Sequence, residues 1–492
     1  MRDFRDRIDL ASLRLGGAVL WASDDSLGAR LHLLSPGDGG RWQTRRRRSP
    51  GHESVLVRLG VPGVIRGLVI DTSSFRDDSP THCAVWACDA PIDARIEDVL
   101  ADEARWFPLL PKSELRGDTP NLFAVHAPWA FTWVRLDIVP DGGVARLRVH
   151  GDGVPDWRRI GHARGELDLA AIEHGGDSLA SSNTAHGERQ HLLLPDRAAT
   201  ASEGWQTPPR RAPGHDWNLL RLGATGTIRR VEVDTSHFHG DAPEACSLDA
   251  IFAPDASLTE LTDPRAAWRE LLPPTKLQGH TRHLIEDTLA ELGEVTHVRF
   301  NIFPDGGVAR LRVHGSLSDG ARRALGVRRL DTLLPERAEA ELRKCCGASR
   351  WVRAMVEARP FGSVSALLEA ADRLWADTTE DDWREAFRSH PRIGESKAAA
   401  GQSATEKRWS TQEQRGASSA SDAARAALAE VNRAYEARFG HIYLVCATGR
   451  TAEELLAIAR ERLGNEPADE LRVAAAEQHK ITRLRLDKLL DP

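Results

Sequence analysis

The sequence has little cysteine and no long apolar run, and both shortages exclude classes of protein. Its 492 residues include six cysteines, two of them adjacent at Cys345 and Cys346, and no Cys-x-x-Cys spacing occurs. Such a chain has no disulfide framework and no zinc-binding pattern, so a reducing, cytoplasmic setting is the simplest interpretation. No apolar run approaches the roughly 18 residues that a membrane-spanning helix needs. Residues 1–8 alternate charges where a signal peptide would be apolar. We therefore expect neither a signal peptide nor a membrane-spanning helix.

An excess of basic residues is also missing. The formal net charge is −6 at pH 7, which argues against general binding to nucleic acid. The main basic run is Arg45 to Arg48. Such a run is either a solvated surface or an anion-binding patch, because guanidinium groups pair with carboxylates through two hydrogen bonds. The sequence leaves both interpretations open.

A segment of twelve residues occurs twice in the chain. Residues 140–151, PDGGVARLRVHG, recur unchanged at residues 304–315. Upstream matches share an offset of 163 residues and include Trp42 with Trp205, His52 with His215, and Cys83 with Cys246. A period this long exceeds any solenoid unit, so each copy is a whole domain of about 150 residues.

Within each copy, apolar and polar residues alternate as in β-strands. The pattern covers residues 65–70, 134–139 and 144–149 in the first copy and 228–233, 298–303 and 308–313 in the second. In the third strand Val144, Arg146 and Arg148 share one face, and Ala145, Leu147 and Val149 share the other. A strand with one apolar face is typical of an antiparallel sheet packed on one side. The sequence therefore predicts a β jelly-roll or β-sandwich at residues 1–160 and again at 161–320.

The character of the chain changes at residues 322–329. From about residue 330 leucine and alanine fall at helical spacing, and residues 366–374, 423–439, 452–463 and 468–490 predict helices. Residues 401–416 have few apolar side chains and predict a loop or a solvated helix end. We therefore expect a multidomain protein, with two tandem β jelly-roll or β-sandwich domains followed by an all-α helical domain at residues 328–492.

Two polar motifs in the helical part could carry chemistry. Pro391 disfavours helix at His390, and a histidine held at a helix end is well placed for acid–base catalysis near neutral pH. Ser410, Glu413 and Gln414 form a later cluster of hydrogen-bonding side chains. The alternative is that His390 caps a helix and Glu413 faces solvent.

Motifs across this whole domain occur in an order that resembles a known family. They are Cys345-Cys-Gly347, Arg350-Trp351, Arg359-Pro-Phe361, His390-Pro-Arg-Ile-Gly394, Ser410 with Glu413-Gln414, residues 439–445 (FGHIYLV) and Arg483-Leu-Arg-Leu486. With these motifs, residues 330–490 resemble 2-oxo-4-hydroxy-4-carboxy-5-ureidoimidazoline (OHCU) decarboxylase. The resemblance implies loss of carbon dioxide from OHCU to give (S)-allantoin.

The resemblance also implies roles for individual residues. His390 becomes the catalytic histidine that delivers the proton, and Glu413 the catalytic glutamate that repels the substrate carboxylate out of the ring plane. Arg485 becomes the arginine that binds substrate, with Arg483 as the competing assignment. The expected pocket residues are Pro391, Ser410, Gln414, His441, Ile442, Tyr443, Leu444 and Val445. No cofactor is expected, because the imine-like ring can accept the electron pair.

The tandem β region resembles a second family, allantoicase, over about residues 8–316. The matching pieces are Gly204-Trp-Gln-Thr207, Arg210-Arg211, Pro213-Gly-His-Asp-Trp217, Asp234-Thr-Ser-His-Phe238, Phe303-Pro-Asp-Gly-Gly307 and Arg310-Leu-Arg312. The resemblance implies two similar jelly-roll domains that hydrolyse allantoate to ureidoglycolate and urea. The first copy departs from the pattern at His52-Glu-Ser54 and Arg76-Asp-Asp78, so the second copy is the better candidate for the hydrolytic site.

Candidate residues for this hydrolysis come from the second copy. An anionic substrate needs arginine, which Arg210, Arg211, Arg310 and Arg312 could supply. His215 and His237 are the catalytic candidates, and Asp216 a substrate ligand. With His239 they could instead hold a divalent metal, although no metal ligand is assigned and each histidine could equally be structural. His150 and His314 lie inside the repeated segment and are expected to serve the fold.

Together these features predict a bifunctional enzyme of purine catabolism. We expect small-molecule ureide substrates, allantoate and OHCU, and neither nucleic acid nor a membrane as partner, with a homo-oligomer left open. The alternative is that only the helical domain is catalytic and the tandem jelly rolls are a ureide- or carbohydrate-binding module.

Overall fold

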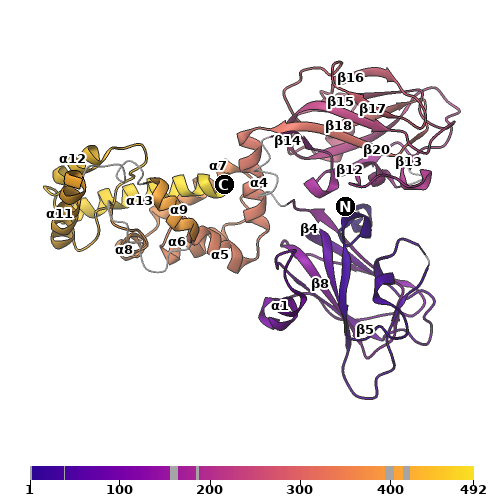
Figure 1. The fold of residues 1–492 in the computed structure, drawn as a ribbon, viewed down its shortest axis with the longest axis horizontal. Helices are drawn as coiled ribbons and strands as arrows, with labels where there is room; N and C mark the ends of the chain where they lie inside the picture. The colour runs from indigo at the N-terminus through magenta and orange to yellow at the C-terminus, as the bar shows by residue number, and fades with distance from the viewer. Residues whose placement is uncertain are drawn as a thin grey trace. The chain divides into compact units, whose positions relative to one another are not determined.

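The computed structural model describes residues 3–37, 39–155, 165–183, 188–393, 404–413 and 422–491. It divides into two compact units, Met1–Arg322 and Arg323–Pro492. The first unit contains the two β-rich copies and the second is helical (Figure 1). The predicted fold class, two antiparallel β-domains followed by a helical region, is confirmed.

Each copy is built around one long strand that changes partners half-way. In the first copy, residues 53–58 of β4 (Glu53–Asp71) pair with β8 (Ala130–Val139) and β2 (Ala18–Ala22). Residues 63–71 pair with β10 (Arg146–Gly153) and β7 (Pro120–Ala124), and of these only Gly63 and Val64 also pair with β8. The remaining strands are β5 (His82–Cys88), β6 (Phe107–Glu114) and β1 (Ile8–Asp9). Helix α1 (Ile96–Ala101) follows β5.

The second copy repeats this pairing strand for strand. The long strand is β14 (Asp216–Asp234). Its partners are β18 (Glu294–Phe303), β12 (Asp177–Ser181), β20 (Arg310–Leu317) and β17 (Arg282–Ile285). The sheet is completed by β15 (Ala245–Ile251), β16 (Arg269–Lys276) and β11 (Leu167–Asp168), and the short helix α3 (Leu258–Thr262) lies between β15 and β16.

The shared residues explain why both copies fold alike. Trp42 and Trp205 are fully buried. The indole N–H of Trp42 donates to the Asp24 carbonyl at 2.9 Å, and that of Trp205 donates to the Asn183 carbonyl at 3.1 Å. The prediction that Val144 shares one strand face with Arg146 and Arg148 is wrong. This residue lies in the short strand β9 (Gly143–Val144), pairs with Trp42 of β3 (Trp42–Gln43) and is buried.

The helical unit contains the predicted helices and two features that the sequence did not indicate. In order the helices are α4 (Asp319–Thr332), α5 (Pro335–Arg343), α6 (Ser349–Glu357), α7 (Val364–Ala376), α8 (Glu380–Arg388), α9 (Ala404–Glu413), α11 (Asp422–Phe439), α12 (Ala452–Arg462) and α13 (Pro467–Leu490). Helix formation begins before residue 330, at Asp319. The segment expected to be a loop or solvated helix end contains α9, because Trp409 anchors that helix in the core.

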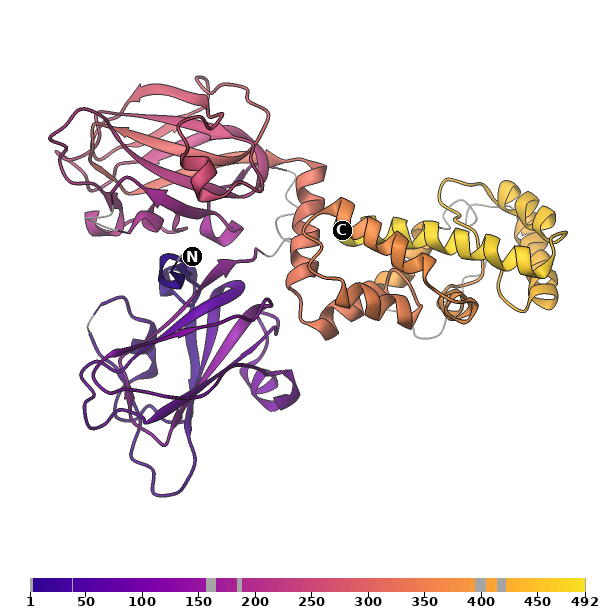
Figure 2. The ribbon, with the colours of Figure 1, turned by 180° about the vertical axis from the view of Figure 1, so that it is seen from behind.

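The long helix α13 organises this unit. Figure 2 shows it in yellow, running along the unit with other helices beside it. Its buried residues include Leu471 and Leu486, which share a core with Trp351 and Phe387. A second core forms around Tyr435, Tyr443 and Leu455. None of the described helices is both long and apolar enough to cross a membrane.

Candidate active sites

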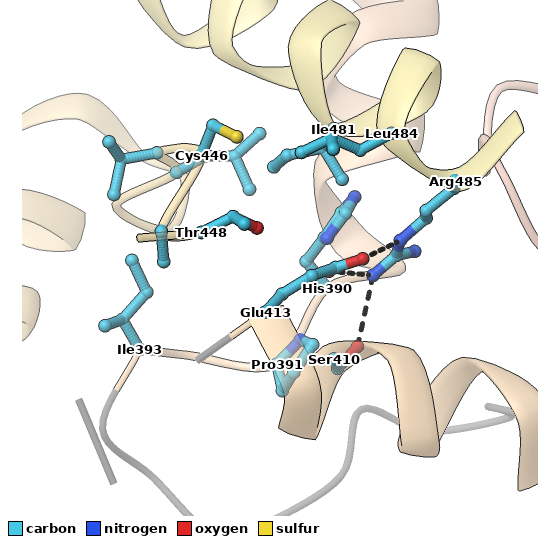
Figure 3. Close-up of a pocket in the computed structure, with 13 residues that line it drawn as sticks. His390, Pro391, Ile393, Ser410, Glu413, Cys446, Thr448, Ile481, Leu484 and Arg485 are labelled. Atoms are coloured by element: carbon cyan, nitrogen blue, oxygen red, sulfur yellow. Dashed lines mark hydrogen bonds and ion pairs between the residues drawn. The ribbon is translucent and has the colours of Figure 1, made fainter. Parts of the chain in front are cut away.

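Four segments of the helical unit meet around a pocket (Figure 3). They are the stretch after α8, helix α9, the chain after residue 443 and the C-terminal half of α13. The residues that line it are His390, Pro391, Ile393, Ser410, Glu413, Leu444, Val445, Cys446, Ala447, Thr448, Ile481, Leu484 and Arg485. The pocket thus collects side chains that are far apart in the sequence.

His390 enters this pocket because α8 ends just before it. The helix stops at Arg388, and the His390 backbone N–H still donates to the Phe387 carbonyl at 3.1 Å. The side chain is buried, and its Nε2 has no hydrogen-bond partner among the described residues. Burial lowers the pKa of His390 well below its usual value, and the nearby Arg485 lowers it further, with Gln478 opposing both. The imidazole is therefore neutral at pH 7.

Arg485 and Glu413 form a buried ion pair beside this histidine. The guanidinium Nη2 lies 3.0 Å from Glu413 Oε2 and Nε lies 3.2 Å from Oε1. Nη2 also donates to the Ser410 hydroxyl at 3.1 Å, and the ammonium of Lys488 donates to Glu413 at 2.9 Å. Arg485 is only 2% exposed. Two cations thus flank the Glu413 carboxylate beside the pocket, and loss of either partner of a buried ion pair is costly.

The structure separates the two candidate arginines of α13. Arg485 lines the pocket, whereas Arg483 pairs with Asp372 of α7 and has a side chain that is 42% exposed. Successive residues of a helix point about 100° apart, so two residues separated by one position face different surroundings.

The β-domain candidates gather at one end of the second copy. Residues 216–221 of β14 pair antiparallel to β18, and residues 226–234 antiparallel to β20, so the strand doubles back on itself. Both of its ends consequently meet the turn between β18 and β20. The backbone N–H of Asp216 donates to the Pro304 carbonyl at 3.2 Å, and that of Ala309 donates to Asp234 at 2.7 Å.

Arg210 and Asp216 form an ion pair at this end. Arg210 Nη1 lies 2.7 Å from Asp216 Oδ1, which also accepts from the Ser182 hydroxyl at 2.9 Å. The first copy holds the matching pair Arg47 and Glu53. Among the neighbouring candidates, Arg211 is exposed, and His215 is half-buried with its ring 4.8 Å from that of Phe303.

Arg310 and Arg312 contact the chain itself. Arg310 is 2% exposed and donates to the carbonyls of Asp196 and Glu203, each at 2.8 Å, and to the Asp196 carboxylate at 2.6 Å. Arg312 donates to the Leu194 carbonyl at 2.5 Å. In this structure both arginines therefore fix residues 194–203, and the predicted contact with a substrate carboxylate remains a prediction.

The histidines after β14 also make structural contacts. His237 has a positive φ of 71°, its Nε2 is 2.8 Å from the Ala198 carbonyl, and its backbone N–H donates to Nδ1 of His280 at 2.9 Å. The His239 ring stacks on that of His280 at 4.3 Å. Within the described ranges, no group of three or more histidine, cysteine, aspartate or glutamate side chains is arranged to hold a metal ion, so we derive no step through a metal.

Comparison with known proteins places both parts of the chain. Residues 8–154 and 167–318 match the sequence profile of the allantoicase repeat, and residues 331–487 match that of OHCU decarboxylase. The chain belongs to the allantoicase family. It is a fusion in which an OHCU decarboxylase domain follows the allantoicase repeats.

Individual allantoicases agree with this assignment. A probable allantoicase from Pseudomonas paraeruginosa is 41% identical over 326 residues, covering 63% of this chain and 96% of that protein. One from Photobacterium profundum is 39% identical over 331 residues, covering 64% and 98%. The crystal structure of allantoicase from Saccharomyces cerevisiae aligns with a TM-score of 0.54 at 29% identity, covering 63% of this chain and 92% of its own.

The decarboxylase pocket contains most, but not all, of the residues predicted for it. Leu444 and Val445 line it, whereas Tyr443 points into the second core and donates to the Leu455 carbonyl at 3.1 Å. His441 packs against the Tyr435 ring, and Ile442 against the main core. Gln414 lies outside the described residues.

Sequence reasoning missed several lining residues. They are Ile393, Cys446, Ala447, Thr448, Ile481 and Leu484. Ile481 could have been found, because it lies four positions before Arg485 on the same face of one helix. The others had no such signal, since loop residues follow no regular period.

Proposed function

We propose that this allantoicase-family chain carries out two reactions of purine catabolism at separate sites. The β-domains hydrolyse allantoate to ureidoglycolate and urea, and the helical domain decarboxylates OHCU to (S)-allantoin. The observation that carries this proposal is the consecutive match to both family profiles along one chain. The geometry of His390, Glu413 and Arg485 adds support for the second reaction. The alternative of a purely binding β-region gains no support from either observation.

In the decarboxylase pocket we assign one role to each polar side chain. Arg485 pairs with an anionic group of the substrate, and Glu413, which contacts Arg485 and Lys488, destabilises the departing carboxylate by repulsion. The carbon–carbon bond to the carboxylate breaks and carbon dioxide leaves. The electron pair of that bond moves into the ring. An anionic substrate offsets the charge of Arg485, which raises the pKa of His390 and lets it carry the proton that it then delivers to that carbon. The electron balance requires no cofactor.

Hydrolysis of allantoate is assigned to the second copy, where the family pattern is more complete. The two reactions are not consecutive, because a separate hydrolase must open the ring of allantoin to give allantoate. We place the protein in the cytoplasm, in keeping with its six free cysteines. Sedimentation of the purified chain would establish whether it forms a homo-oligomer.

Two product assays test this function. Purified chain is incubated with allantoate and urea is measured, with and without a chelator; in parallel, loss of OHCU is followed by its absorbance. We expect both products, and loss of urea formation with chelator alone would assign a divalent metal to the hydrolase. Folded protein that forms no urea under either condition would contradict the hydrolase assignment and favour a binding role for the β-domains.

A further inference from the structure

The two β-domains differ at one place where the first is filled and the second is hollow. In the second copy a hollow is lined by Leu179, Ala180, Ser181, Arg221, Pro254 and His297, and Asp255 and Asp6, the latter from the first copy, add carboxylates to its lining. His297 stands opposite Arg221 across the β14–β18 pairing. In the first copy, Trp133 stands opposite Arg58 in the same register, so Trp133 and His297 are equivalent positions.

Tryptophan side chains occupy this space in the first copy. Trp133 is fully buried, and its indole N–H donates to the Pro91 carbonyl at 3.1 Å. Trp21 packs against the hydrophobic cluster that contains Trp133. Trp21 pairs with Leu56 as Ala180 pairs with Leu219, so the second copy has alanine and histidine where the first has two tryptophans.

The substitutions leave a polar lining, which distinguishes this hollow from a packing defect. The His297 side chain is buried, and its Nδ1 lies 3.0 Å from the Thr296 hydroxyl. No hydrogen bond to its Nε2 is found among the described residues. Burial, together with the charge of Arg221, lowers the pKa of His297 to about 4, so the ring is neutral at pH 7. A bound carboxylate that offsets the charge of Arg221 raises this pKa again and makes the ring a stronger base.

Arg221 supplies a cation beside this neutral histidine. Its side chain is 39% exposed, and the nearest carboxylate oxygen, from Asp177, is 3.7 Å away. That distance is too long for a direct hydrogen bond, so the guanidinium keeps donors for a ligand carboxylate.

We propose that this hollow binds a ureido-carboxylate and is the site at which the second copy hydrolyses it. Arg221 pairs with the substrate carboxylate. His297 takes a proton from the water whose oxygen adds to the carbon bearing that carboxylate. The bond from this carbon to one ureido nitrogen breaks, and that nitrogen takes up the proton and leaves as urea. This inference rests on the proposed hydrolysis of allantoate, and it places the reaction away from His215 and His237, whose contacts hold the end of the sandwich.

The test fills the hollow as the first copy fills it. His297→Trp and Ala180→Trp are made in the full chain, with Leu284→Trp as the matched control, because Leu284 is 59% exposed on β17 of the same domain. Each filling variant is expected to lower urea release from allantoate by about 100-fold or more, while OHCU decarboxylation and the unfolding temperature stay unchanged. Leu284→Trp is expected to keep both activities. Arg221→Gln is expected to raise KM for allantoate more than it lowers kcat.

Two outcomes would overturn the proposal. One is a folded His297→Trp or Ala180→Trp protein that keeps urea release within about twofold of the wild type. The smaller Ala180→Leu serves if tryptophan prevents folding. If the wild-type chain releases no urea, the proposed function fails by itself, and calorimetric titration with allantoate then decides the site: binding that the filling variants abolish supports the hollow, and unchanged or absent binding overturns it.

Discussion

At the residue scale, the surroundings of a side chain decide its chemistry more than its type does. Arg310 is buried against backbone carbonyls and fixes a loop. Arg485 is equally buried, but it faces a pocket and pairs with Glu413. Both belong to motifs that the sequence had assigned to substrate binding, but of these two arginines only Arg485 lines a pocket.

The two arginines of α13 give a matched test of this distinction. Arg485→Gln removes a cation from the pocket and leaves Glu413 with Lys488 alone, so OHCU decarboxylation is expected to fall by about 100-fold or more. Arg483→Gln removes only the pair with Asp372 on a part-exposed surface and is expected to change the rate less than about threefold. Steady-state kinetics of both variants check this. Equal losses in the two would contradict the assignment of Arg485.

A second residue-scale prediction concerns acid stability. His297 has its pKa lowered to about 4 in the folded chain, whereas in the unfolded chain it titrates near its ordinary value of about 6.5. The unfolded state therefore binds more protons between these values. The free energy of unfolding falls as pH drops through this window and is fully recovered above it.

The size of this effect follows from the shift. Between pH 6.5 and pH 5 the wild type is expected to lose about 2 kcal/mol more stability than His297→Gln does. Denaturant unfolding of both proteins at the two pH values measures the difference. Parallel losses in the two proteins would show that the histidine is not held neutral by the fold.

At the scale of elements, the long strand of each copy determines where the candidate residues meet. β14 doubles back after residue 221, and a repeated glycine at this bend lets another backbone segment come close: a Cβ on Gly223 would lie 2.0 Å from the His174 carbonyl oxygen. Gly60 has the same role against Leu15 in the first copy, at 2.4 Å. The repeated Arg-Leu-Gly motif thus serves the close approach of two backbone segments.

This approach makes a prediction about stability. Gly223→Ala forces the backbone apart and is expected to destabilise the β-unit by roughly 1–3 kcal/mol. Gly240→Ala is the control, because a Cβ there meets nothing within 4 Å, and it is expected to change stability by less than about 0.5 kcal/mol. Thermal unfolding of the two variants distinguishes them. A Gly223→Ala protein as stable as Gly240→Ala would refute the packing argument.

At the scale of the whole molecule, the two reactions belong to different compact units. A change in one pocket should therefore leave the other reaction intact. His390→Asn is expected to lower OHCU decarboxylation by about 100- to 10,000-fold, because asparagine cannot supply the proton. Urea release from allantoate by the same protein is expected to stay at the wild-type rate. A parallel fall in urea release would show that the units are coupled.

The sequence by itself determined the repeat, the strand periodicity, the most regular helices and both family relationships, because these depend on local order along the chain. It also predicted His390, Glu413 and Arg485 as site residues, with Arg483 as the alternative to Arg485, because they stand in short motifs.

Only the tertiary structure decided which of these side chains share a pocket. It placed Tyr443 in a hydrophobic core, buried one side of α9 through Trp409, and paired Arg310 with the carbonyls of a loop. It also showed that His297, the counterpart of Trp133, lines a hollow that no motif marks. Packing sets these outcomes, since a side chain's neighbours come from strands and helices far away in the sequence.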